Sequence, residues 1–396
     1  LYLFDHNNKK YLDMTSNWWA NIIGYSQPKI ADAIAKQAYK CAHVRFADLT
    51  HEPAIQLTKE MLDILPSTID KIFFSESGSS AVEVAVKIAL QYWLNKNVKN
   101  KNKIIAFQGG FHGETFGSMA LGKSTGFFDH FTENLFQVDF MPYPETWIDD
   151  KLAIDKEMKA INSIKEFIKK DNIAAVIIEP IIQGSSGMRV VNPIFIKKIT
   201  KLFQENNILV IYDEIMTGFG RLGEFFSSDI VKTEPDIICL GKSLSGGVLP
   251  ISATAVTKNV HNVFNGMSFK TALAHGHTYS ANPICCAASL ASLYLLKHDN
   301  VLEKIKNIEK THHKNINKLL SIKGVLKPRI IGSIMAITLD ESYDKKMHNI
   351  KSELTKLGIL IRPLENNIYF MPNAIVECNV IEHAYDMLAC VLKNAV

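Results

Sequence analysis

Four apolar segments in the middle of the chain have the pattern of buried β-strands. They are rich in Ile, Val and Leu and lack the polar–apolar alternation of half-exposed strands. They cover residues 103–107, 174–179, 208–213 and 236–240. Helical segments lie between them, for example 155–171 and 192–206. This alternation predicts an α/β fold with a mostly parallel central sheet flanked by helices.

The two ends of the chain have a different texture. Residues 2–12 predict a short hairpin with polar turn residues at its tip. After a polar break at 298–300, the strands become shorter, as at 334–339 and 368–371, and lie between helices. We therefore expect a large domain over residues 16–298 and a smaller α+β domain made of residues 1–15 and 299–396.

The composition limits the classes of protein to which the chain can belong. Of its 396 residues, 47% are hydrophobic and 21% are charged, so the chain can bury a large core and is not disordered. The 44 basic and 40 acidic residues give a net charge of only +4. We expect no nucleic-acid partner, because such binding needs a concentrated basic face. The basic run 96–103 is diluted by Asn and reads as a solvated loop.

Cysteine usage and hydropathy bear on the cellular setting. The six cysteines form no C-x-x-C motif, and a chain this large and apolar needs no disulfide framework, so we expect a reducing, cytoplasmic setting. No uninterrupted apolar run reaches the ~18 residues of a membrane span, so we expect no membrane partner. The sequence opens at Leu1 without an initiator Met, so we expect that a further segment precedes it.

Charged residues follow two of the predicted strands. Residues 208–212 are followed by Asp213 and Glu214, and segment 236–240 is followed two residues later by Lys242. In open α/β sheets ligands bind beyond the carboxyl ends of the strands, so this acid and this lysine would face one crevice. The other interpretation is a structural ion pair, and these two residues alone do not decide between them.

Two further segments have features of a ligand site. Residues 75–80 lead into the small-residue helix 81–86, whose first N–H groups and dipole favour a phosphate. The other interpretation of this segment is an ordinary Ser N-cap. Residues 109–113 form a Gly-rich loop that presents Phe111, whose ring suits stacking on a flat heterocycle. The other interpretation of this loop is a simple turn.

Together these features indicate one cofactor. A lysine, a strand-end acid, a helix N-terminus suited to phosphate and a stacking ring are the set that pyridoxal 5′-phosphate requires. The lysine forms a Schiff base with the cofactor aldehyde, and the acid keeps the pyridine nitrogen protonated. His275 and His277 lack a nearby third ligand, so we predict no metal site.

The chain resembles the class III aminotransferases of the fold-type I pyridoxal-phosphate superfamily. The stretches that carry the resemblance are 77–79, 111–113, 211–221, 239–243 and 275–279, so the match runs over nearly the whole chain. The resemblance implies that Lys242 is the Schiff-base lysine and that Asp213 is the partner of the pyridine nitrogen. It also implies an obligate homodimer with the active site at the subunit interface. The other cofactor-binding residues that it implies are Gly78 and Ser79 at the phosphate, Phe111 on the ring, His112, and Thr278 reaching the phosphate of the neighbouring subunit.

Within that family, the Trp18-Trp19 pair in the stretch 14–20 is typical of one branch. The resemblance to this branch implies transamination of 8-amino-7-oxononanoate to 7,8-diaminononanoate in biotin biosynthesis, with S-adenosylmethionine as the amino donor. It implies a substrate site in which Arg362 binds the carboxylate. The other substrate-contacting residues would be Trp18, Trp19, Gly276 and Tyr369, and the other interpretation of the Trp pair is core packing or a dimer contact.

Three positions depart from the pattern of this branch. The chain has Phe111 where Tyr is usual, Glu114 where Asp is usual, and His277 where Pro is usual. All three positions would lie near the amino donor. The identity of the donor therefore stays open between S-adenosylmethionine and lysine. A second candidate activity is that of an ω-amino acid aminotransferase acting on ornithine or 4-aminobutyrate with a 2-oxo acid. A third candidate is a non-catalytic binding homologue, which the retention of Lys242 and Asp213 disfavours.

Overall fold

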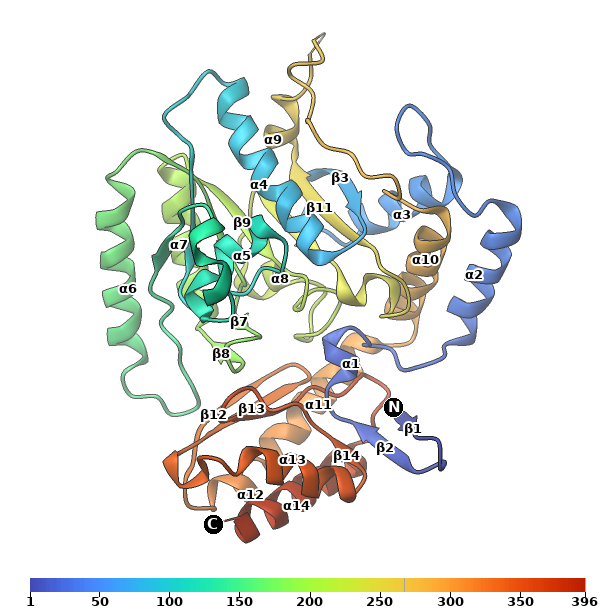
Figure 1. Ribbon diagram of the computed structural model, residues 1–396, viewed down its shortest axis with the longest axis vertical. Helices are drawn as coiled ribbons and strands as arrows, with labels where there is room; N and C mark the ends of the chain where they lie inside the picture. The colour runs from blue at the N-terminus through green and yellow to red at the C-terminus, as the bar shows by residue number, and fades with distance from the viewer. Residues whose placement is uncertain (267, 396) are drawn as a thin grey trace.

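A seven-stranded sheet forms the centre of the molecule (Figure 1). The computed structural model describes residues 1–266 and 268–395, and within them the largest sheet has the strand order β3-β11-β10-β9-β6-β4-β5. Neighbouring strands from β10 to β5 are parallel, whereas β11 runs antiparallel to both β10 and β3. The strands are β3 (Ile69–Ser75), β4 (Lys103–Phe107), β5 (Asp139–Met141), β6 (Ile173–Ile178), β9 (Leu209–Asp213), β10 (Ile237–Leu240) and β11 (Ser252–Thr257).

The apolar segments of the sequence are interior strands of this sheet. Strands β4, β6, β9 and β10 coincide with the four predicted segments to within one residue at each end, and the α/β fold is confirmed. Every residue of β6, β9 and β10 is buried, which is why these segments are continuously apolar. The sequence pattern does not predict β3 and β11. Strand β3 is an edge strand of mixed burial, and β11 consists mostly of Ser, Ala and Thr.

Helices cover both faces of the sheet. Along β4, Ile105 and Phe107 join the core cluster of α6 and α7, whereas Ile104 and Ala106 join the cluster of α4. Helices α6 and α7 confirm two predicted helices. In the described residues no helix combines the length and apolarity that a membrane span requires. The helices around this sheet are α2 (Pro28–Lys40), α3 (Glu52–Leu62), α4 (Gly78–Asn95), α5 (Phe116–Gly122), α6 (Ala153–Ile168), α7 (Pro193–Glu205), α8 (Ser227–Val231), α9 (Lys258–Asn262) and α10 (Pro283–His298).

A second group of elements lies below the main sheet in Figure 1. Strands β12, β13 and β15 form an antiparallel sheet there, and the N-terminal hairpin β1–β2 pairs with β14, which runs parallel to β2. The predicted hairpin is thus confirmed, whereas the exact domain bounds stay a prediction. The elements are β1 (Tyr2–Phe4), β2 (Lys10–Asp13), α11 (Val301–Asn315), α12 (Asn317–Leu320), β12 (Val325–Ile331), β13 (Ile334–Leu339), α13 (Met347–Lys356), β14 (Ile359–Leu360), β15 (Asn367–Phe370) and α14 (Cys378–Ala395).

The short helix α1 (Ser16–Trp19) is left-handed and lies between the two groups of elements (Figure 1). All four of its residues have positive φ: 48° at Ser16, 48° at Asn17, 59° at Trp18 and 73° at Trp19. For L-amino acids the left-handed helical conformation costs roughly 1–2 kcal/mol per residue. The contacts around this turn must therefore hold it in place.

Two charged side chains hold the left-handed turn. A carboxylate oxygen of Asp13 accepts a hydrogen bond from the Asn17 N–H at 2.6 Å. The guanidinium of Arg221, which is completely buried, donates to the Trp19 carbonyl at 3.0 Å and to the Ser16 hydroxyl at 3.3 Å. Burial lowers the pKa of Arg221 to about 9, so the side chain stays a cation at neutral pH.

The exposed position Asn17 gives a test of this handedness. Glycine adopts positive φ without a steric cost, whereas alanine does not. We expect Asn17→Gly to be at least as stable as the natural chain, and Asn17→Ala to lose about 1 kcal/mol or more of unfolding free energy. The urea midpoints of the two variants, compared with that of the natural chain, measure the difference.

Lys310 in α11 supplies the control, because its exposed side chain stands in an ordinary right-handed helix. There the order must reverse, with Lys310→Ala more stable than Lys310→Gly by about 1 kcal/mol. Alanine outranking glycine at position 17 as well would contradict the left-handed conformation of α1.

Candidate active site

The carboxyl ends of β9 and β10 bring Asp213 and Lys242 to the same cavity. The two strands are parallel neighbours with Cys239 opposite Asp213, and Lys242 follows the end of β10. Both side chains line a cavity of about 250 Å³, which we call the inner cavity. It opens beyond the carboxyl edge of the sheet, where the strand order predicts a ligand site.

Asp213 pairs with a histidine rather than with Lys242. Its Oδ2 lies 2.8 Å from His112 Nδ1, and its Oδ1 accepts a hydrogen bond from the Ile215 N–H at 3.1 Å. Asp213 and His112 are both buried. Among the described residues Lys242 forms no ion pair with Asp213, so the interpretation of these two residues as a structural ion pair is wrong.

Lys242 is a desolvated amine at the end of the inner cavity. Burial lowers its pKa, and the carboxylates of Asp213 and Glu179 oppose that shift without cancelling it. Its Nζ lies 5.3 Å from the centre of the Trp19 ring. The lowered pKa favours a larger share of the neutral amine, which is the form that acts as a nucleophile or a base.

The N-terminus of α4 forms one wall of the inner cavity. Ser77 caps the helix by accepting a hydrogen bond from the Ser80 N–H at 3.2 Å, and Gly78 and Ser79 line the cavity. A Cβ on Gly78 would lie only 3.0 Å from the Ile215 side chain. The Ser N-cap and a phosphate site are therefore compatible. The cap leaves the N–H groups at the very start of the helix without an intrahelical partner, and these can bind an anion.

Phe111 lines both the inner cavity and a second cavity beside it. The ring packs against Phe127 and Phe128 with centroid distances of 6.4 and 6.0 Å. The Ser79 hydroxyl accepts a hydrogen bond from the Glu114 N–H at 3.1 Å, which ties this loop to the start of α4. The loop is thus a fixed wall rather than a simple turn.

Glu179 is a buried residue of the site to which the sequence assigns no role. One of its carboxylate oxygens accepts the Phe111 N–H at 2.8 Å and the other accepts the Gly184 N–H at 2.9 Å. Desolvation raises the pKa of Glu179 to about 7. The sequence signal is an acid at the end of a predicted strand, since segment 174–179 ends in Glu179 just as segment 208–213 ends in Asp213. Glu179 joins the Phe111 loop to the loop that carries Ser185.

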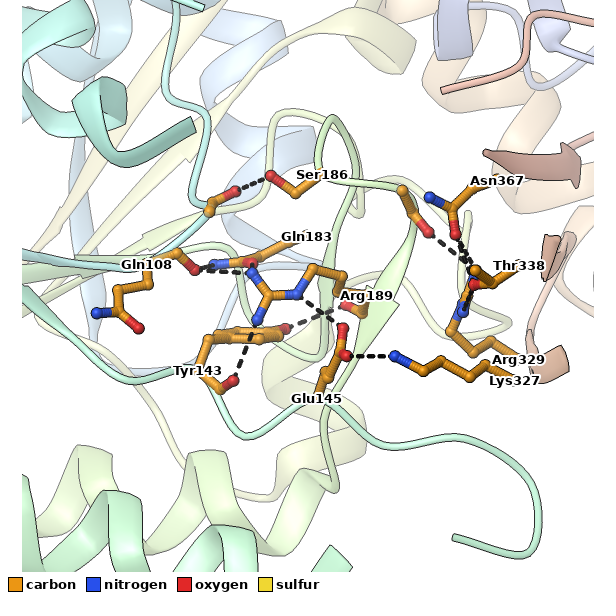
Figure 2. A network of polar contacts seen from close by, with 12 residues as sticks. Gln108, Tyr143, Glu145, Gln183, Ser186, Arg189, Lys327, Arg329, Thr338 and Asn367 are labelled. Atoms are coloured by element: carbon orange, nitrogen blue, oxygen red, sulfur yellow. Dashed lines mark hydrogen bonds and ion pairs between the residues drawn. The ribbon is translucent and has the colours of Figure 1, made fainter. Parts of the chain in front are cut away.

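A polar network holds that second loop in place (Figure 2). The loop connects β7 (Ile182–Gln183) to β8 (Arg189–Val190). Arg189 Nε donates to Glu145 at 3.0 Å, and Lys327 bonds the other oxygen of Glu145 at 3.1 Å. Arg329 donates to the Gly187 carbonyl at 3.1 Å. Because Lys327 and Arg329 belong to β12, the network fixes the loop to the C-terminal elements.

The second cavity, of about 490 Å³, is the outer cavity. Lys242, Trp18, Trp19 and Arg362 all line it. Tyr369 does not line either cavity; it is buried behind Trp19 and accepts a hydrogen bond from the Trp19 indole N–H at 2.9 Å. Tyr369 therefore reaches the site through Trp19.

The segment with Gly276 and Thr278 lies outside both cavities, and both residues are exposed. His277 Nδ1 contacts the Glu76 carboxylate, and His275 Nδ1 lies 3.0 Å from Lys87 Nζ. Within the described parts of the chain, no three His, Cys, Asp or Glu side chains gather as a metal would require. These two histidines belong to a surface cluster beside the start of α4.

The inner cavity fits the cofactor that the sequence indicates. It offers an aromatic face, a carboxylate, an amine and a helix N-terminus at Phe111, Asp213, Lys242 and Gly78. Glycine at position 78 keeps the start of α4 open for the phosphate, since a Cβ there would press on the Ile215 side chain. A flat ring with an aldehyde, a basic ring nitrogen and a phosphate matches each of these groups.

Comparison with known proteins identifies the family. The model of class III aminotransferases matches residues 1–392. The adenosylmethionine-8-amino-7-oxononanoate aminotransferase of Synechococcus elongatus is 38% identical, with 98% of this chain and 92% of the relative covered. The crystal structure of the enzyme of that name from Methanocaldococcus jannaschii has a TM-score of 0.92 at 34% identity, covering 99% of this chain and 91% of that one.

A more distant relative has the same fold with the cofactor in place. It is a pyridoxal-phosphate-bound amine transaminase from an uncultivated Pseudomonas species, with a TM-score of 0.90 at 25% identity, covering 100% of this chain and 92% of that one. The family match over nearly the whole chain and the geometry of the inner cavity agree. The chain belongs to the class III aminotransferases.

Proposed function

We propose that the protein transfers an amino group to the ketone of 8-amino-7-oxononanoate and so forms 7,8-diaminononanoate, with S-adenosylmethionine as the donor. The observation that carries this proposal is that one outer cavity is lined by both Lys242 and Arg362. The relatives named above support the same substrate. A nonanoate needs such a cavity, because its reacting carbon and its carboxylate stand at opposite ends of a methylene chain.

Pyridoxal 5′-phosphate is the cofactor, and when bound it supplies an aldehyde that exchanges amino groups and a ring that withdraws electrons from the reacting carbon. Lys242, with its lowered pKa, accepts and returns the proton at that carbon. Asp213 holds the proton at the ring nitrogen, and its bond to His112 keeps the carboxylate oriented. Gly78 and Ser79 would take the phosphate, and Phe111 would cover the ring.

In this proposal the substrate's carboxylate pairs with Arg362, which presents two parallel N–H donors to it. The methylene chain passes between the aromatic rings of the outer cavity, Trp18, Trp19 and Phe111 among them. Each buried methylene contributes about 0.8 kcal/mol, so a shorter ω-amino acid would bind less tightly. This gradient favours the nonanoate over ornithine or 4-aminobutyrate.

We further propose that the enzyme works as a homodimer in which Thr278 reaches the phosphate held by the partner subunit. The support within one chain is that Thr278 is exposed and lies outside the cavities. Tyr279, next to it, is also exposed although it is a large aromatic residue. A partner subunit would cover both residues.

The first prediction of the proposed function concerns the substrate. We expect 7,8-diaminononanoate, added to the enzyme in its pyridoxal form, to convert the bound cofactor rapidly to its pyridoxamine form. Ornithine and 4-aminobutyrate lack the long chain, so we expect no conversion with them. The visible absorbance of the cofactor reports both results. Conversion by an ω-amino acid without conversion by the diamine would mean that the enzyme is an ω-amino acid aminotransferase.

The second prediction concerns Lys242. We expect Lys242→Ala to fold and to lose turnover by at least about 10³-fold, because both the cofactor linkage and the proton carrier are gone. Steady-state assays with both substrates measure the loss. The control is Lys258→Ala, an exposed lysine that begins α9, which should keep full activity. Multiple turnover in Lys242→Ala would contradict the role proposed for this amine.

The third prediction concerns the dimer. Thr278→Asp should abolish activity by setting a negative charge against the partner's phosphate, and Lys242→Ala should abolish it in its own subunit. Mixing the two inactive variants should restore about a quarter of natural activity, since half of randomly assorted dimers are hybrids with one intact site. Sedimentation verifies assembly. No recovery in mixed dimers would show that Thr278 serves its own subunit.

A further inference from the structure

The guanidinium of Arg362 lies on the face of an exposed tryptophan. Its Cζ is 3.7 Å from the centre of the Trp18 ring, well within the range of a cation–π contact. Across residues 1–266 and 268–395, Arg362 makes no ion pair and no side-chain hydrogen bond. The other four arginines, by contrast, all have such partners. Arg362 is thus a positioned cation whose donors are free.

Strand pairing brings these two residues together from opposite ends of the chain. Strand β14 runs parallel to β2, with Ile359 opposite Leu12 and Leu360 opposite Asp13. Arg362 comes two residues after β14. The left-handed turn with Trp18 begins three residues after β2. The register of this pair therefore fixes the distance between the ring and the guanidinium.

The backbones of Trp18 and Arg362 are both conformationally restricted. Trp18 is 59% exposed, but it belongs to the left-handed turn that Asp13 and Arg221 hold. Arg362 precedes Pro363, which restricts its backbone to extended conformations. Packing within the core of its own chain therefore does not account for Trp18. What the ring contacts is the Arg362 guanidinium, and both side chains line the outer cavity.

We propose that Trp18 is a positioning residue that holds the Arg362 guanidinium in place to receive the carboxylate of the substrate. An unsupported arginine must lose rotamer freedom when it grips a carboxylate, which weakens binding. Because the Trp18 ring already restricts the guanidinium before the substrate binds, less rotamer freedom is lost on binding. The inference rests on the proposed function, because it requires a substrate with a carboxylate far from its reacting carbon.

The rival explanation is that Trp18 is merely an apolar wall for the methylene chain. The two roles differ in what they do to a substrate without the carboxylate. A wall contributes equally to a chain with or without a carboxylate at its end. A positioning residue for Arg362 contributes only when the carboxylate is present.

The experiment therefore compares two diamines. One is 7,8-diaminononanoate, and the other is 2,3-diaminooctane, which has the same diamine end and no carboxylate. The quantity measured is the ratio of their second-order rate constants for conversion of the bound cofactor, taken from the dependence of the conversion rate on diamine concentration. It is determined for the natural holoenzyme, Trp18→Leu, Trp18→Phe, Arg362→Leu and the double variant. Melting temperature and cofactor absorbance verify that each variant is folded and loaded.

We expect Trp18→Leu to lower the ratio by about 3- to 30-fold, the range of a cation–π contact. The loss should appear mainly as a higher half-saturating concentration of the diaminononanoate, with little change in the maximal conversion rate. Trp18→Phe keeps an aromatic face and should recover most of the ratio. In the Arg362→Leu background, Trp18→Leu should lower the ratio no further, because the group through which it acts is gone.

Trp147→Leu is the matched control, since Trp147 also holds a cation, with Lys156 Nζ 3.8 Å from its ring, but lines neither cavity. It should leave the ratio unchanged. An unchanged ratio in Trp18→Leu, or equal losses with and without Arg362, would overturn the inference. Failure of the natural enzyme to convert 7,8-diaminononanoate would instead overturn the proposed function, so the two failures are distinguishable.

Discussion

The buried guanidinium of Arg221 is the constraint on which the arrangement of the site depends. It donates to the Trp19 and Asn21 carbonyls at 3.0 and 3.4 Å, and to the Ser333 hydroxyl and the Pro372 carbonyl at 3.4 Å. Arg221 lies between β9 and α8. Its guanidinium therefore connects that segment to the left-handed turn, to the turn between β12 and β13, and to the residues after β15. A buried charge is costly unless its donors are paired, and these oxygens pair both terminal nitrogens of Arg221, whereas its Nε has no partner among the described residues. The strain of four left-handed residues persists because releasing it would strand this charge.

Exclusion of water from the inner cavity has opposite consequences for its charged groups. Desolvation lowers the pKa of Lys242 and raises the pKa of Glu179 to about 7, because in each case it disfavours the charged form. Lys242 has no hydrogen-bonding partner among the described residues, so its lowered pKa leaves a larger share of neutral amine. Both carboxylate oxygens of Glu179 accept hydrogen bonds from backbone N–H groups. The side chain therefore connects two loops. The same physical environment thereby yields one reactive group and one structural group.

The sequence predicted those parts of the fold that follow from local composition. Runs of β-branched residues gave the interior strands, since burial on both faces demands them, and the polar break after α10 marked the change of texture. It could not predict α1, because Ser-Asn-Trp-Trp has no glycine and its handedness is imposed by Asp13 and Arg221. It could not predict β11 either. The small side chains of that strand fit beneath α4 and carry no strand signal of their own.

The candidate site likewise has parts that the sequence predicted and parts that it did not. Groups that end strands or begin helices, such as Asp213, Lys242 and Gly78, were visible in the sequence because topology alone brings them to one edge of the sheet. Contacts between distant segments were not. That Asp213 pairs with His112, and that Arg362 lies on Trp18, depends on loop paths and on the β2–β14 register. A motif therefore specifies which chemistry is present, whereas the geometry that selects a substrate is set by pairings between segments far apart in the chain. For the function proposed above, substrate selection would therefore depend on the contact between the N-terminal turn and the residues that follow β14.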